Sequence, residues 1–221
     1  LEESVKAVET LFDIDINYYV KVNYSTVIGV IDAIDGIDVY SDFSFCVDDS
    51  DVCFKKGNNH LTGYRAMMFA RERQSFKDGD IQRVKNQQKV LEAVINKATS
   101  STKIISNYSE ILNSVSENLS TNMDTKSINK FVKMQLNDMS GWSIESINLT
   151  GINSYSENTY TFPGTNLYVM DQDLESVNFA KNKIVWSFSL NAFINYASRY
   201  SIYSSRQKPN SLIFLACSTP T

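Results

Sequence analysis

Residues 57–88 contain the sequence that decides the fold. They begin with Gly57-Asn-Asn-His-Leu61-Thr62-Gly63-Tyr-Arg-Ala66-Met-Met-Phe-Ala-Arg71-Glu-Arg73 and end with Asp80-Ile-Gln-Arg83-Val-Lys-Asn86-Gln87-Gln88. The first part predicts a short helix from about Thr62 to Ala70, and the second opens a longer helix that ends near Ala98. Three arginines, Arg71, Arg73 and Arg83, stand close to the start of that longer helix. Guanidinium groups bind phosphate bidentately and keep their charge, so this segment predicts a site for a phosphate-rich ligand.

One face of the longer helix carries apolar residues at helical spacing: Leu91, Val94 and Ala98. Arg83 and Gln87 fall on the same stripe, so the predicted core face becomes polar and cationic in its first two turns. An arginine on the buried side of a helix needs an anionic partner, because an unpaired buried charge is costly. Asp80, three residues earlier, and a ligand anion are the two candidates for that partner.

The segments upstream predict an α/β fold. Tyr18–Val22 alternates as a strand does, residues 27–34 carry apolar residues at helical spacing, and Ile37–Tyr40 reads as a second short strand. Residues 2–12 also predict a helix. Strand, helix and strand in quick succession indicate a layered α/β domain.

The composition of the chain limits its partners. The 221 residues are 43% hydrophobic and 21% charged, as in an ordinary globular domain. The net charge of −4 argues against a general nucleic-acid surface, so an anion site must be a local basic cluster. No apolar window of about 18 residues occurs, so no membrane span is predicted within the chain.

The cysteines suggest a disulfide hairpin. Cys46 and Cys53 flank a short acidic segment that looks like the loop between two strands. A bridge between them is expected if the protein lies outside the cytoplasm, and two free thiols flanking a loop are the alternative. Cys217 has no obvious partner. With a single histidine and no Cys-x-x-Cys motif, metal binding by cysteine is not predicted.

The character of the chain changes near its end. No acidic residue follows Glu175, while basic and aromatic residues remain frequent. We therefore predict two parts, a domain over residues 1–184 and an atypical aromatic and basic tail over residues 185–221. The tail either lies outside the domain proper or forms a membrane-surface or partner-binding segment.

The segment quoted at the start resembles the LytR-CpsA-Psr family of cell-envelope glycopolymer phosphotransferases. The resemblance lies in a glycine–leucine–glycine pattern before a helix, an Arg-x-Arg, and an acidic–Arg–Gln-Gln run. The matching residues are Gly57, Leu61, Gly63, Ala66, Arg71, Arg73, Asp80, Arg83, Gln87 and Gln88. Tyr18–Asn23 and Val30–Val39 are also similar to family sequence. The resemblance extends from about residue 1 to about residue 183.

The resemblance implies a fold and a reaction. The fold is a layered α/β/α sandwich with a central mixed sheet and an apolar pocket for a prenyl chain. The enzymes take teichoic acid or capsular polysaccharide from undecaprenyl pyrophosphate and attach it to peptidoglycan through a phosphodiester. They act at the extracytoplasmic face of the bacterial membrane, held by an N-terminal anchor, and Mg²⁺ assists. Nucleic acid is not an expected partner.

The resemblance also assigns roles to residues. Arg71, Arg73 and Arg83 are the expected catalytic residues, Gln87 joins them in binding the pyrophosphate, and Asp80 orients them. Solvated surface charge, paired with Glu72 or Asp78, is the alternative for the first two arginines. Met67, Met68 and Phe69 either line the lipid pocket or belong to the core. Asn86 departs from the family, which has a second arginine there.

A further departure concerns the beginning of the chain. The family segment that carries the metal-holding aspartates is missing, so we expect no metal ligands in this chain and a catalytic domain truncated at its N-terminus. An inactive chain that only binds polyprenyl pyrophosphate is therefore an alternative to the enzyme. A transcriptional regulator is disfavoured, because no helix-turn-helix with a basic recognition face is evident.

Overall fold

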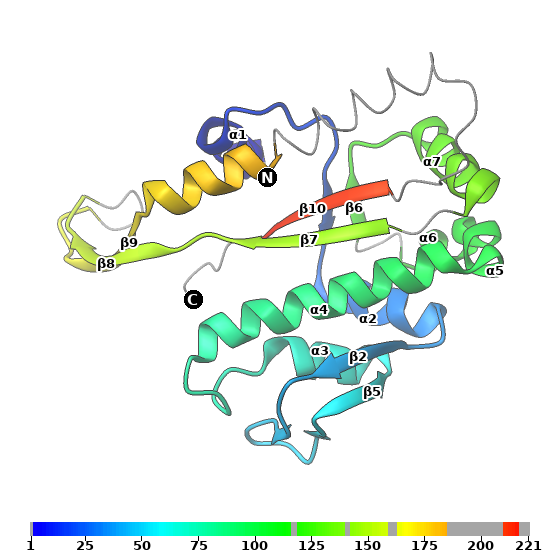
Figure 1. Ribbon diagram of the computed structural model, residues 1–221, viewed down its shortest axis with the longest axis horizontal. Helices are drawn as coiled ribbons and strands as arrows, with labels where there is room; N and C mark the ends of the chain where they lie inside the picture. Colours follow the sequence, from blue (N-terminus) through cyan, green and yellow to red (C-terminus); the bar gives the residue numbers. More distant parts are fainter. Residues whose placement is uncertain (1, 116–118, 140–141, 159–162, 185–209, 217–221) are drawn as a thin grey trace. The chain divides into compact units, whose positions relative to one another are not determined.

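The computed structural model describes residues 2–115, 119–139, 142–158, 163–184 and 210–216 (Figure 1). The helices are α1 (Glu2–Phe12), α2 (Tyr24–Ala33), α3 (Gly63–Arg71), α4 (Gly79–Ser100), α5 (Thr102–Ser106), α6 (Tyr108–Val115), α7 (Thr125–Asp138) and one over 174–184. The strands are β1 (Val20–Val22), β2 (Ile37–Ser41), β3 (Phe45–Cys46), β4 (Cys53–Phe54), β5 (Gly57–Leu61), β6 (Leu119–Thr121), β7 (Trp142–Asn148), β8 (Gly151–Ser156), β9 (Leu167–Gln172) and β10 (Asn210–Ala216).

The described residues fall into two compact units. The larger contains residues 17–145 and carries every residue that the sequence analysis assigned to the phosphate site. The smaller contains α1, the antiparallel hairpin β8–β9 and the helix over 174–184. Most of the predicted tail lies outside the described residues; within it, β10 pairs with β7.

The α/β class is confirmed, but the described strands do not form one central mixed sheet. They pair in twos, β1 with β6, β2 with β5, β3 with β4, β7 with β10 and β8 with β9. In β2 the side chains alternate between buried and exposed, with Asp38 and Tyr40 facing outward. A central sheet needs apolar residues on both faces, whereas this alternation suits an antiparallel pair that is covered on one side only.

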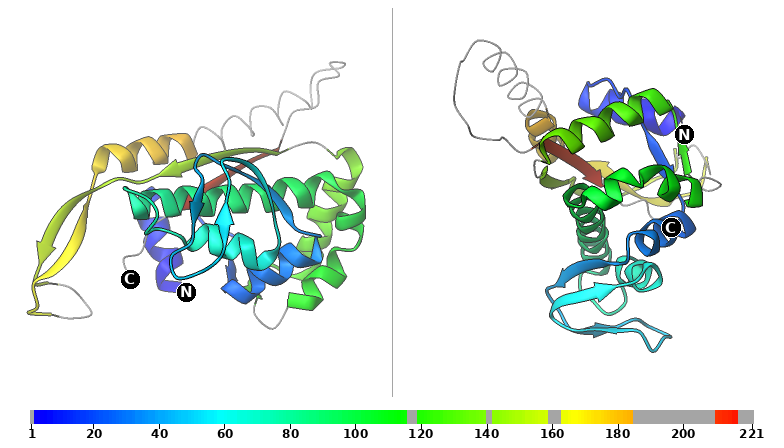
Figure 2. Two further views of the ribbon diagram at one scale, coloured as in Figure 1. Left: turned by 90° about the horizontal axis from the view of Figure 1, so that it is seen from below. Right: turned by 90° about the vertical axis from the view of Figure 1, so that its right-hand side faces the viewer.

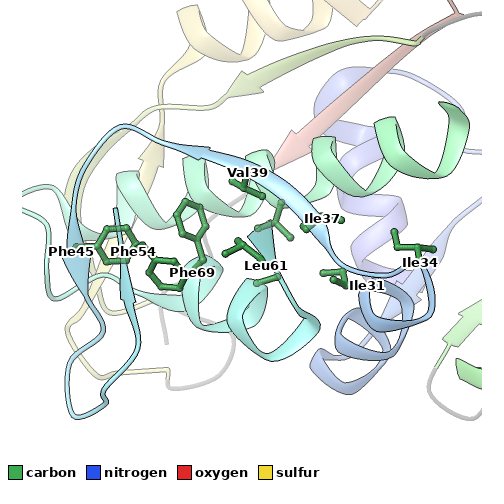
Figure 3. Packing of buried hydrophobic residues seen from close by; sticks show 10 residues of the cluster. Ile31, Ile34, Ile37, Val39, Phe45, Phe54, Leu61 and Phe69 are labelled. Carbon is green, nitrogen blue, oxygen red and sulfur yellow. The ribbon is translucent and has the colours of Figure 1, made fainter. Parts of the chain in front are cut away.

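The core of the larger unit joins α2, α3 and α4 to β2 and β5 (Figure 3). Ile31, Ile37, Leu61 and Phe69 are fully buried. At one end of this core the rings of Phe45 and Phe54 contact each other and Phe69 in tilted and edge-on arrangements, with centroids 5.0–5.6 Å apart. The helix α3, which leads into Arg71, is therefore fixed by packing along its length.

The start of α3 lies directly against α2. A Cβ atom at Gly63 would stand 2.3 Å from the carbonyl oxygen of Ile28, so only glycine fits this crossing. The Gly63 N–H also donates to Asp32 Oδ1 at 2.7 Å. This contact fixes the N-terminus of α3 against α2, and so the direction of the helix that ends at Arg71.

The buried row of α4 differs from the one that the sequence predicts. The buried residues are Gln82, Asn86, Gln88 and Val90, while Gln87 and Leu91 are exposed. Gln82 Nε2 donates to Asn86 Oδ1 at 2.9 Å, and Asn86 Nδ2 donates to the Phe69 carbonyl at 3.2 Å. Because these amides satisfy one another and the backbone of α3, a polar row can face the protein interior. Figure 2 shows α4 running alongside α3.

The position of Asn86 explains the departure from the family motif. Its side chain is only 2% exposed, and its hydrogen bond to the Phe69 carbonyl joins α4 to the last turn of α3. An arginine here would need space and a counter-charge, whereas an amide is satisfied by the neighbouring amide and carbonyl.

The helix α7 offers a test of local stability. Asp124 is its N-cap, and Oδ1 accepts the Ser127 N–H at 2.6 Å. Hydrogen bonds from the backbone and then the hydroxyl of Ser127 hold the pKa of Asp124 below its ordinary value of 3.8. Because the folded pKa is lowered, this stabilisation is present above pH 3.8 and is lost as the pH falls through the folded value.

We expect Asp124→Ala to lower the Tm at neutral pH, as measured by circular dichroism. The difference from wild type should shrink as the pH is lowered below 3.8. Asp124→Asn is the control, since asparagine also caps helices but does not titrate. An Asp124→Ala variant with the wild-type Tm at pH 7 would contradict the cap.

Candidate functional site

Arg73 and Arg83 share one carboxylate. Asp80 Oδ1 lies 3.2 Å from Arg83 Nη2 and 3.8 Å from Arg73 Nη1. Arg83 is on the same helix as Asp80, while Arg73 comes from the loop between α3 and α4. The carboxylate that the sequence proposed as partner for Arg83 is therefore in place, but it is shared between two guanidinium groups. One positive charge is left over at this point.

Arg83 retains an unused donor. Its side chain is 16% exposed, and its Nε atom is buried and finds no hydrogen-bond partner among the described residues. An unsatisfied buried N–H is costly, so an acceptor that enters beside Arg83 would gain a strong, charge-assisted hydrogen bond.

Arg71, the last residue of α3, lies against Tyr24 at the start of α2. Its guanidinium carbon lies 5.0 Å from the centroid of the Tyr24 ring, and Nη1 is 3.9 Å from the sulfur of Met67. Among the described residues Arg71 forms no ion pair. Glu72, considered above as a possible partner, is buried and accepts backbone N–H groups instead. Tyr24 was not singled out from the sequence.

Gln87 of α4 lines a pocket near Arg71. It lies one turn after Arg83 on α4, where residues four apart share a face. It lines the same pocket as Tyr24 and Met67, the two residues that Arg71 contacts. The structure brings Arg73 and Arg83 together at Asp80, and it places Gln87 in the lining of the pocket whose residues Tyr24 and Met67 contact Arg71.

The pocket that Gln87 lines is apolar, and a second apolar cavity lies farther along α4, toward the C-terminal end of that helix. The smaller has a volume of about 270 Å³ and the larger about 530 Å³, and Val30 of α2 lines both. The three residues of the apolar stripe of α4 line these cavities: Leu91 and Val94 the smaller, and Ala98 the larger. Of the three candidate lipid-pocket residues, Met67 lines the smaller cavity, and Phe69 is packed in the core.

The hairpin β3–β4 contacts the loop between α3 and α4 that carries Arg73, called the arginine loop below. Cys46 and Cys53 face each other across the two strands, and their sulfur atoms are bonded. The expected disulfide is therefore part of the structure of this hairpin.

The described residues offer no ready metal site. No three of their His, Cys, Asp and Glu side chains gather closely enough to hold an ion, and Asp80 is occupied by two guanidinium groups. A single, doubly paired carboxylate does not fit Mg²⁺, which prefers several oxygen ligands. In the same part of the chain, no helix combines the length and the apolarity that crossing a bilayer requires.

Fold and site together define a class of protein. Guanidinium groups near an apolar pocket suit an amphiphilic ligand with a phosphate head and a hydrocarbon tail. The LytR_cpsA_psr family matches residues 1–176, and the chain belongs to that family.

Individual relatives are teichoic acid transferases by name. The chain is 37% identical over 123 residues to the polyisoprenyl-teichoic acid–peptidoglycan teichoic acid transferase TagU of Bacillus mycoides, a match covering 56% of the chain and 40% of TagU. It is 33% identical over 185 residues to the corresponding transferase TagV of Bacillus subtilis, covering 79% of the chain and 46% of TagV. The crystal structure of B. subtilis TagV superposes with a TM-score of 0.64 at 30% identity, covering 82% and 68% of the two chains. The chain spans less than half the length of these two curated relatives.

Proposed function

We propose that this chain belongs to an extracytoplasmic phosphotransferase that moves an anionic glycopolymer, a teichoic acid or a capsular polysaccharide, from a polyprenyl pyrophosphate to peptidoglycan. The observation that carries the proposal is the sharing of Asp80 by Arg73 and Arg83, together with an apolar cavity that Gln87 lines and whose residue Tyr24 contacts Arg71. A diphosphate would supply the acceptors and the negative charge that this cluster lacks.

The arginines have a defined task in such a reaction. A peptidoglycan hydroxyl attacks the phosphorus atom that bears the sugar, and the bond from that phosphorus to the bridging oxygen breaks. The products are a phosphodiester between polymer and peptidoglycan, a prenyl monophosphate and the released hydroxyl proton. Negative charge grows on the bridging and terminal oxygens, where guanidinium groups stabilise it. Asp80 keeps Arg73 and Arg83 together before the ligand arrives.

The two cavities suit the hydrocarbon part of the ligand. Their linings are almost wholly apolar, and they adjoin each other at Val30. A prenyl chain whose head group meets Arg71 and Gln87 would enter the smaller cavity first and then the larger. Removing each methylene group from water contributes about 0.8 kcal/mol, so the tail would supply much of the affinity.

The disulfide and the family support the location and the cofactor. A disulfide between Cys46 and Cys53 persists in an oxidising compartment, as at the outer face of a bacterial membrane. Mg²⁺ and the N-terminal membrane anchor remain part of the proposal through the family alone.

A binding and release assay tests the proposal. Farnesyl pyrophosphate should bind more tightly than farnesyl monophosphate, by about tenfold or more, because the second phosphate adds charge-assisted hydrogen bonds. Polymer release from a lipid-linked substrate, followed with Mg²⁺ and with a chelator, separates the enzyme from a module that only binds. Equal affinity for the two farnesyl compounds would contradict a diphosphate site.

A further inference from the structure

Glu72, between the two arginines of the Arg-x-Arg motif, is a buried carboxylate. It is 5% exposed and follows the last residue of α3. Oε1 accepts the N–H of Ser75 at 2.7 Å, and Oε2 accepts the N–H of Asp48 at 3.3 Å. One oxygen thus holds the loop that carries Arg73, and the other holds the loop of the β3–β4 hairpin.

The same two segments are joined at further points. Ser75 Oγ donates to the carbonyl of Cys46 at 2.6 Å. The ring of Phe76 packs edge-on against Phe45 of β3, with centroids 4.7 Å apart. On the opposite strand, Arg65 of α3 donates to the carbonyl of Cys53 at 2.8 Å. The backbone carbonyls of both disulfide cysteines are therefore bound by residues of α3 or of the arginine loop.

Arg73 itself has little freedom in this loop. Its carbonyl accepts the N–H of Phe76 at 3.2 Å, which closes a turn. A Cβ atom at Gly79 would lie 2.6 Å from that carbonyl oxygen, so the first turn of α4 is packed directly against Arg73. A shift of Ser75 or Phe76 must therefore move the backbone of Arg73.

We infer that Glu72 and Ser75 are positioning residues, which hold the loop of Arg73 against the β3–β4 hairpin. The affinity of the Arg73–Arg83 pair for a diphosphate would therefore depend on the Cys46–Cys53 disulfide. The inference rests on the proposed diphosphate site. The hairpin strands contain only two residues each, so the bridge adds a covalent constraint to a short strand pairing at Cys46 and Cys53. Opening the disulfide would free the hairpin to move, and the Asp48 N–H that Glu72 accepts and the Cys46 carbonyl that Ser75 binds would move with it.

Four variants test the coupling, all made in a Cys217→Ser background to prevent thiol exchange. Glu72→Gln replaces one acceptor oxygen by a donor, Ser75→Ala removes the hydroxyl bond, and the pair Cys46→Ser with Cys53→Ser opens the hairpin. Ser75→Thr keeps a hydroxyl. We expect farnesyl pyrophosphate to bind about tenfold more weakly to Glu72→Gln and to the cysteine pair, and severalfold more weakly to Ser75→Ala. Ser75→Thr should restore affinity.

Two readouts separate positioning from general loosening. Farnesol has the tail but no phosphate, so its affinity should be unchanged in every variant that remains folded. Combining Glu72→Gln with the cysteine pair should weaken pyrophosphate binding by less than the product of the separate effects, because both changes break one network. Lys55→Ala, an exposed change on the segment just after β4, is the control and should bind like wild type.

The outcomes are distinct. If wild type binds farnesyl pyrophosphate and all four variants bind equally well, the positioning role is wrong and the proposed function stands. If the effects of Glu72→Gln and of the cysteine pair on pyrophosphate affinity multiply fully, the coupling between them is wrong. It is equally wrong if the affinity for farnesol falls as much as the affinity for farnesyl pyrophosphate. A wild-type protein that does not distinguish farnesyl pyrophosphate from farnesol overturns the proposed function and this inference with it.

Discussion

Replacing Arg83 by alanine is expected to reduce glycopolymer transfer by about 10²–10³-fold, the usual effect of removing one donor to developing negative charge. Arg83 is the most enclosed of the three arginines assigned to the site, it pairs with Asp80, and its Nε has no acceptor among the described residues. The loss should appear mainly in kcat if the guanidinium acts in the transition state. The measurement is the initial rate of polymer release under saturating lipid-linked substrate.

Two controls make that result specific. Lys85→Ala removes an exposed positive charge from the same helix and should leave the rate within about twofold of wild type, because surface charges contribute little. Arg83→Lys keeps the charge but loses the planar fork and should recover only part of the rate. Circular dichroism checks that each variant is folded. A folded Arg83→Ala variant with the wild-type rate would remove Arg83 from the chemistry.

The second large effect is expected from filling the larger cavity. Ala98→Trp places an indole among residues that line the space of about 530 Å³ beside α4 and α7. If the prenyl chain occupies this space, farnesyl pyrophosphate should bind about 10–100-fold more weakly, since several methylene groups lose their apolar contacts. Inorganic pyrophosphate, which has no tail, should bind as before. Isothermal titration of both ligands measures the difference.

Asn96→Trp is the matched control, because Asn96 is an exposed position on the same helix outside both apolar cavities. Its affinity for farnesyl pyrophosphate should equal that of wild type. Unchanged farnesyl pyrophosphate binding by a folded Ala98→Trp variant would show that the hydrocarbon tail lies elsewhere.

The helices and the arginine cluster could be predicted from the sequence because their signals are local. Helical periodicity and the Arg-x-Arg and Asp-x-x-Arg spacings indicated α3, α4 and the pairing of Asp80 with Arg83, which the structure contains. The roles of Arg71, Arg73, Arg83 and Gln87 in binding a ligand stay predictions.

The face of α4 could not be assigned from the sequence. Leu91, Val94 and Ala98 were expected to be the core face. Val94 does pack against the core, but Leu91 and Ala98 line cavities, and the buried residues of α4 are Gln82, Asn86, Gln88 and Val90. Periodicity identifies an apolar face but not whether protein or ligand covers it. The amide row became possible only because the Phe69 carbonyl of α3 accepts a hydrogen bond there.

Tertiary contacts account for the other residues that the sequence did not reveal. Tyr24 lies far from Arg71 along the chain, and nothing near it signals that its ring would lie against that guanidinium. Glu72 looked like a counter-charge for its neighbours, but the hairpin and the loop supply N–H donors that hold it inside. Both depend on segments that meet only after folding.

A crystal structure of the protein with farnesyl pyrophosphate tests the central claim most directly. We expect the diphosphate oxygens to lie within hydrogen-bond distance of the guanidinium groups of Arg71, Arg73 and Arg83, with the farnesyl chain entering the cavity lined by Gln87 and Leu91. A diphosphate bound elsewhere, with these three side chains turned away from it, would contradict the account.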